Sequence, residues 1–154
     1  MFDRFILKIR ELIHFFLHLD LYFRKKVILR GVPKILYGDR INFGKNIRIN
    51  DNVFLHAANG IKIGDNTTLS YGACIISESY DVTNKIKYLE RCHSGAPITI
   101  GKNVWICANV VILPGVSIED NIIVGAGSVV TKSLTSSNSL YAGNPAKFIK
   151  KMEI

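Results

Sequence analysis

Residues 100–134 read IGKNVWICANVVILPGVSIEDNIIVGAGSVVTKSL, and this stretch decides the fold because its pattern repeats every six residues. An aliphatic residue leads each unit, at Ile100, Ile106, Ile112, Ile118, Val124 and Val130. A period of six matches neither the 3.6 of a helix nor the 2 of an ordinary strand. It fits a short strand and a tight turn, three to a coil, with each leading side chain pointing inward.

The same register continues towards the N-terminus, where the leading residues are Phe43, Ile49, Leu55, Ile63, Leu69 and Ile75. The fifth position of each unit is small or aliphatic and is also expected inside: Ile47, Val53, Thr67, Ala73, Val104, Val110, Val116, Ile122 and Ser128. Gly-Asp-Asn, Gly-Lys-Asn and Asn-Gly clusters supply turn-forming residues for the corners. We therefore expect one all-β domain of stacked coils over residues 31–150.

Two interruptions break the repeat. Residues 59 and 60 are a short insertion between two units. Residues 76–97 form a long excursion that is too polar and irregular to continue the coil. Long loops in compact folds are commonly functional or disordered, so this protruding loop is the first place to look for a site.

Residues 1–30 do not follow the six-residue repeat and are expected to form a separate N-terminal amphipathic helical segment. Their apolar side chains follow helical spacing, at Phe2, Phe5, Ile6, Ile9, Leu12, Ile13 and Phe16, and the other faces are basic on balance. Residues 1–25 are expected either to pack against the protein or a neighbouring subunit, or to make peripheral contact with an anionic membrane. His14 and His18 lie one helical turn apart, but with no third ligand they predict no metal site.

Length and composition set further bounds. A chain of 154 residues is long enough for one ordinary domain. The net charge of +8 predicts an anionic partner, yet the basic clusters lack the interleaved aromatics of a nucleic-acid groove, so we expect no nucleic acid. Cys74, Cys92 and Cys107 lack CxxC spacing, which argues against disulfides and zinc and favours a reducing cytosol.

Membrane insertion is not expected from the sequence. The apolar stretch near the N-terminus is not followed by a small-residue cleavage site, so no signal peptide is expected. Its longest uncharged run, residues 12–19, is far shorter than the roughly 20 residues that span a bilayer. We expect a cytoplasmic protein, with peripheral contact at the inner membrane face as the alternative that residues 1–25 leave open.

The motifs VWI, ILPGV, GAGSVVTK and GNPAK, in this order and spacing, resemble the hexapeptide-repeat acyltransferases over residues 41–150. The branch that they resemble is the one of maltose and galactoside O-acetyltransferases. The resemblance implies a left-handed parallel β-helix and a homotrimer that holds acetyl-CoA in a groove between neighbouring chains. It implies no metal.

The resemblance also assigns residues to acetyl-CoA: Trp105, Ala108, Ala126, Thr131, Lys132, Lys147 and Lys150. The backbone of the two alanines would contact the pantetheine arm, and the tryptophan would flank the site. The Thr-Lys pair would lie near the adenosine phosphates. The two C-terminal lysines stand where the family commonly has arginines, so charge is kept while bidentate geometry is lost. Simple coil packing and solvated corners are the structural alternatives for these positions.

The family's catalytic histidine lies at the start of the protruding loop, and Tyr80 stands in its place here. A tyrosine, with an ordinary pKa near ~10, is a poor base at neutral pH. His93, on the same loop, is the favoured catalytic base, and His56 is the alternative. Tyr80 and Asp81 are expected to hydrogen-bond the substrate or orient the base.

The function predicted from these features is transfer of an acetyl group from acetyl-CoA to a sugar hydroxyl, in surface polysaccharide or lipopolysaccharide biosynthesis. Loss of the usual histidine supports a different reading, a catalytically silent trimeric scaffold or ligand-binding module. A metal-dependent hydratase on the same fold would need three convergent histidines. The coil region holds two.

Overall fold

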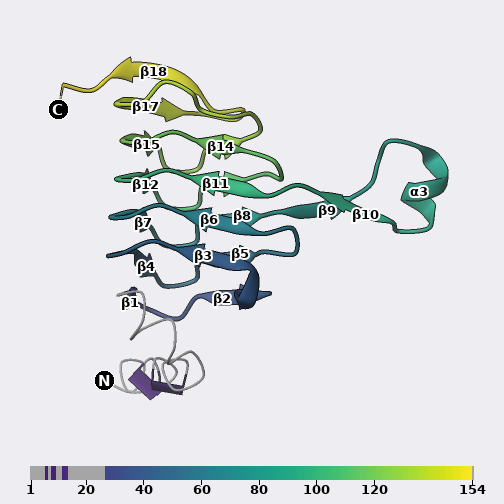
Figure 1. Cartoon of the computed structure of the whole chain (residues 1–154), viewed down its shortest axis with the longest axis horizontal. Helices are drawn as coiled ribbons and strands as arrows, with labels where there is room; N and C mark the ends of the chain where they lie inside the picture. The colour runs from purple at the N-terminus through teal and green to yellow at the C-terminus, as the bar shows by residue number, and fades with distance from the viewer. Residues whose placement is uncertain (1–5, 7, 10–11, 14–26, 154) are drawn as a thin grey trace.

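The computed structural model describes residues 6, 8, 9, 12, 13 and 27–153 and shows coils stacked into a prism (Figure 1). Three sheets form its sides, and we number them in the order in which the chain visits them. Sheet 1 contains β1 (Ile28–Arg30), β4 (Arg48–Asn50), β7 (Thr68–Leu69), β12 (Trp105–Ile106), β15 (Ile122–Val124), β17 (Ser139–Ala142) and β18 (Lys147–Lys151). Sheet 2 contains β2 (Lys34–Leu36), β5 (Phe54–His56), β8 (Cys74–Ile76), β13 (Val111–Ile112) and β16 (Val129–Val130). Sheet 3 contains β3 (Ile41–Phe43), β6 (Ile61–Ile63), β11 (Ile98–Ile100) and β14 (Ser117–Ile118).

Strands within each sheet are parallel, apart from β18, which runs antiparallel to β17. Successive strands of the chain belong to successive sheets, so each strand pairs with strands one coil above and below. The predicted β-helix of six-residue units is therefore confirmed. A short 3-10 helix, η1 (Gly38–Arg40), lies between β2 and β3.

The core is a single column that runs through all the coils. Every leading residue of the repeat is at most 4% exposed, and so is every fifth-position residue named above. Stacking places like residues over one another, as where Leu55 pairs with Ile75 and Ile75 with Ile112. The pattern of buried residues is thus set by the repeat itself.

The corners explain why asparagine recurs in the sequence. Seven asparagines adopt positive φ at corners: Asn46, Asn52, Asn66, Asn103, Asn109, Asn121 and Asn138. Asparagine tolerates this left-handed region better than other non-glycine residues. At the edge between sheets 3 and 1 their amides form a ladder, with Nδ2 to Oδ1 distances of 2.9, 3.2 and 2.9 Å along the series Asn46, Asn66, Asn103 and Asn121.

Aspartates bind neighbouring coils at the same edge. Asp65 Oδ1 accepts a hydrogen bond from the Lys45 amide at 2.8 Å, and Asp120 Oδ1 accepts one from the Lys102 amide at 2.7 Å. The residue before each donor is glycine, and a Cβ at Gly101 would lie 2.4 Å from Asp120 Oδ1. The Gly-Lys-Asn and Gly-Asp-Asn clusters are therefore the means by which one coil docks closely on the next.

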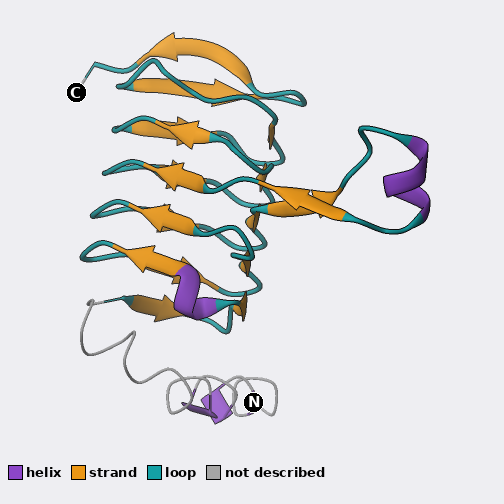
Figure 2. Ribbon diagram, turned by 45° about the vertical axis from the view of Figure 1, so that its right-hand side comes forward, coloured by secondary structure: helices purple, strands orange, loops and turns teal. Residues whose placement is uncertain are grey.

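The long excursion is ordered. It begins as an antiparallel hairpin of β9 (Glu78–Tyr80) and β10 (His93–Gly95), with the short helix α3 (Lys85–Leu89) at its tip. Figure 2 shows the hairpin extending away from the prism where sheets 2 and 3 meet. The coil resumes at Ile98, which pairs with Ile61.

Most of the predicted N-terminal helix, residues 1–25, lies outside the described residues, as do His14 and His18. The helix and its membrane contact stay predictions. In the part of the chain that is described, no helix has the length and apolar character needed to cross a bilayer.

Candidate functional site

The base of the hairpin brings together the two residues on which the catalytic prediction depends. His93 on β10 is the direct cross-strand partner of Tyr80 on β9. Their ring centroids are 4.9 Å apart, with the ring planes inclined by 46°. The predicted base thus lies beside Tyr80, the residue that the resemblance assigns to the family's histidine position.

A hollow of about 290 Å³ opens at this point, and both candidate histidines line it. His93, Tyr80 and Glu78 come from the hairpin, whereas His56 comes from the end of β5 in the coil below. His56 enters the hollow because it pairs with Ile76, the last residue of β8 before the excursion. The structure therefore brings His93, Tyr80 and His56 together, a convergence that the six-residue pattern does not reveal.

Glu78 is a site residue that the sequence prediction missed. Its Oε2 lies 3.5 Å from His93 Nδ1. A carboxylate beside Nδ1 favours the tautomer that is protonated there and leaves the Nε2 lone pair free to accept a proton. The signal in the sequence was the spacing, since Glu78 and Tyr80 lie two residues apart and face the same side of a strand.

His56 is held differently. Its Nδ1 is buried and has no hydrogen-bond partner among the described residues, and the Tyr37 ring packs edge-on against it at 5.4 Å. A buried N–H without an acceptor is costly, so the proton is better placed on Nε2. His56 then offers the hollow a hydrogen-bond donor, in contrast to the acceptor that His93 offers.

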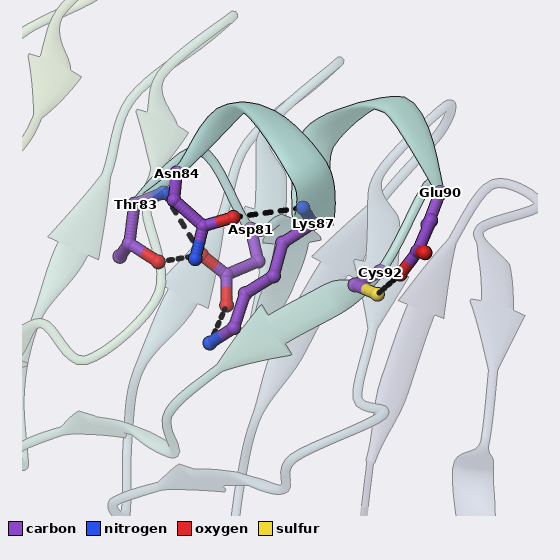
Figure 3. A network of polar contacts seen from close by, with 6 residues as sticks. All are labelled: Asp81, Thr83, Asn84, Lys87, Glu90 and Cys92. Carbon is purple, nitrogen blue, oxygen red and sulfur yellow. Dashed lines mark hydrogen bonds and ion pairs between the residues drawn. The ribbon is translucent and has the colours of Figure 1, made fainter.

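Asp81 is committed to contacts within the hairpin (Figure 3). Its carboxylate accepts hydrogen bonds from the Thr83 amide at 2.9 Å and the Thr83 hydroxyl at 2.5 Å, and pairs with Lys87 Nζ at 2.9 Å. These contacts, the Thr83 hydroxyl first, lower the pKa of Asp81 from 3.8 to about 2. The contact of Asp81 with substrate stays a prediction. Its observed partners, Thr83 and Lys87, belong to the tip of the hairpin.

The residues predicted to contact pantetheine lie elsewhere on the prism. Trp105 is on the outer face of sheet 1, half exposed, and its Nε1 donates to Ser70 Oγ at 2.9 Å. Ala108 and Ala126 follow β12 and β15 on successive coils at the edge between sheets 1 and 2, where the Gly127 amide donates to the Ala108 carbonyl at 2.9 Å.

The residues predicted to contact phosphate lie on the last coils. Thr131 and Lys132 are exposed directly after β16, at the same edge as the hairpin, and Lys147 and Lys150 are exposed on β18. The predicted acetyl-CoA residues thus occupy more than one edge, and one chain does not gather them all around His93. Among the described residues no three His, Cys, Asp or Glu side chains gather as a metal site would require.

Comparison with known proteins agrees with the β-helix fold and shows the family of the chain. Residues 97–132 match the family described as bacterial transferase hexapeptide (six repeats). Galactoside O-acetyltransferase of Escherichia coli strain K12 is 37% identical over 116 residues, which cover 75% of this chain and 56% of that protein. The chain thus spans little more than half the length of this relative.

Two further matches cover more of the relative. A putative colanic acid biosynthesis acetyltransferase of Escherichia coli strain K12 is 32% identical over 127 residues, or 82% of this chain and 67% of that protein. A galactoside acetyltransferase solved in complex with coenzyme A superposes with a TM-score of 0.75 at 32% identity, covering 82% of this chain and 64% of that one. The chain belongs to the hexapeptide-repeat acetyltransferase family, on the branch that contains the galactoside enzymes.

Proposed function

We propose that the protein is an acetyl-CoA-dependent O-acetyltransferase that acts on a sugar hydroxyl, with His93 as its general base. One observation carries the proposal: His93 faces Tyr80 across the hairpin with ring centroids 4.9 Å apart. Tyr80 is the residue that the family resemblance places at the catalytic histidine.

The chemistry follows from the two nitrogens offered to the hollow. His93 Nε2 removes the proton of the acceptor hydroxyl as its oxygen attacks the thioester carbonyl carbon. The His56 N–H is a donor for the negative charge that develops on the carbonyl oxygen. When the carbon–sulfur bond breaks, the imidazolium of His93 returns its proton to the leaving sulfur, so the products are the acetyl ester and free coenzyme A.

The relatives support the donor and the class of acceptor. One is named for transfer to galactosides and another for colanic acid biosynthesis, and a related structure holds coenzyme A. We propose a sugar acceptor in surface polysaccharide or lipopolysaccharide biosynthesis. The site of the reaction would be the cytoplasm, where residues 1–25 would contact the inner membrane face.

A homotrimer would complete the site. Thr131 and Lys132 share an edge with His93, whereas Trp105, Ala108 and Ala126 belong to sheet 1 and its far edge. If neighbouring chains pack so that one edge of each faces sheet 1 of the next, acetyl-CoA in the groove between them can contact both sets.

The test is coenzyme A release from acetyl-CoA with a panel of sugars. We expect His93→Gln to lower kcat/KM by about 10²- to 10⁴-fold, because general-base catalysis contributes that much, while acetyl-CoA still binds. Ser94→Ala, an exposed neighbour on β10, is the matched control and should keep full activity. Loss of acceptor-dependent turnover in His56→Gln but not in His93→Gln would make His56 the base. A wild-type protein that binds no acetyl-CoA would instead be a silent scaffold.

A further inference from the structure

A second hollow, of about 440 Å³, lies on the outer face of sheet 1. It extends over four neighbouring strands, β1, β4, β7 and β12, and so over the first four coils. Its polar lining includes Arg30, Arg48, Asn50, Ser70 and Trp105. The hairpin residues do not contribute to it.

Both arginines are exposed, and neither has an acidic partner among the described residues. The ion pairs of the described chain are those of Lys87 with Asp81 and His93 with Glu78, and neither includes Arg30 or Arg48. The arginines lie on adjacent strands, where Arg30 is level with Asn50 and Arg48 is level with Thr68. Two arginines on adjacent strands, offset by two residues and without an acidic partner among the described residues, favour a carboxylate or phosphate ligand.

Trp105 supplies an apolar surface at the other end of the hollow. Its ring is 50% exposed and is fixed by the hydrogen bond from Nε1 to Ser70 Oγ. A rigid indole face next to serine and asparagine side chains suits a ligand with apolar faces and hydroxyl edges, as a pyranose ring has. Trp105 is two strands from Arg48, or about 10 Å, which fits a charged saccharide longer than one ring.

The phosphates of acetyl-CoA are poor candidates for the arginines. Their predicted partners, Thr131, Lys132, Lys147 and Lys150, belong to the last coils, whereas β1 and β4 lie at the opposite end of the stack (Figure 1). The hollow on sheet 1 therefore fits a second anion.

We infer that this hollow binds an acceptor saccharide that carries a carboxylate or phosphate group. Arg30 and Arg48 would hold the anion, and Trp105 would hold a sugar ring. The inference rests on the proposed function and narrows its acceptor to an anionic glycan. Uronic acids and glycosyl phosphates share this chemistry, and the experiment separates them.

Trp105 is the single tryptophan of the chain, so intrinsic fluorescence measured in the absence of acetyl-CoA reports on ligands that bind in this hollow. The full-length protein is titrated with methyl glucuronide, glucose 1-phosphate, methyl glucoside and inorganic phosphate. We expect a saturable change with one or both charged sugars, weaker at high salt. Arg48→Gln and Arg30→Gln should each raise the Kd by about tenfold or more. Lys62→Gln, which removes an exposed charge from sheet 3, should leave it unchanged.

Four results would overturn the inference. Methyl glucoside could change the fluorescence as much as the charged sugars do, or inorganic phosphate alone could bind as tightly as they do. No probe could change the fluorescence at all, or the arginine variants could dissociate the oligomer without changing saccharide binding. Binding does not require turnover, so the two proposals fail separately. If His93-dependent acetyl transfer persists without binding here, this inference alone is wrong. If charged saccharides bind and no acetyl transfer occurs, the proposed function is wrong.

Discussion

Gly101 shows, at the scale of single residues, how closely the coils approach one another. A methyl group at this position would meet Asp120 Oδ1, the acceptor for the Lys102 amide. We expect Gly101→Ala to lower the free energy of unfolding by about 1–3 kcal/mol, the usual cost of overpacking. Gly38→Ala is the control, because its Cβ would meet only Ile35 Cγ2 at 3.4 Å. Urea denaturation measures both, and equal midpoints would contradict the docking role of the glycine.

The titration of Asp81 is a second prediction for a single residue. Its pKa is 3.8 without its partners and about 2 in the fold, so its contribution to the order of the hairpin tip is fully present above pH 3.8 and is lost as the pH falls through 2. An NMR titration of the Asp81 side-chain carboxyl carbon should give a pKa of about 2. Thr83→Val should raise the pKa of Asp81 more than Lys87→Met, because the Thr83 hydroxyl is the largest cause of its lowering. The reverse order would make the ion pair dominant.

Among the elements, the hairpin divides into a base that forms the site and a tip that the coil does not need. None of residues 82–91 is buried, whereas Asp81 is. We expect replacement of residues 82–91 by Asn-Gly, a favoured two-residue hairpin turn, to leave the Tm of the β-helix within a few degrees of the wild type. Thermal melting by circular dichroism measures this, and a large fall in Tm would show that the tip supports the coil.

The sequence predicted some elements far better than others, for a physical reason. Each leading residue of the coil occupies an equivalent environment, so one period predicts them all, as the burial of Ile106, Ile112 and Ile118 confirms. The hairpin has no repeat. Its register, which pairs His93 with Tyr80, depends on how the turn closes, and the approach of His56 depends on stacking between coils.

For the whole molecule, a site shared between chains makes a prediction that a site within one chain does not. If the protein forms the proposed homotrimer with its site between chains, the His93→Gln and Trp105→Ala variants should each be inactive. After they are unfolded and refolded together, mixed trimers should recover about a quarter of the wild-type activity, because that fraction of interfaces joins an intact His93 to an intact Trp105. Coenzyme A release measures the recovery. Activity that stays at the level of the separate variants would place both residues in a site within one chain.

The last strand has a consequence for how copies of the molecule can associate. An open sheet edge is a template for another chain, and β17 would offer one that a β1 strand of a second copy could continue. Instead, β18 reverses direction and covers that edge with five exposed residues, three of which are lysines. Charge repulsion at this end opposes the end-to-end association of copies, so the molecules should not polymerise into filaments along the axis of the β-helix.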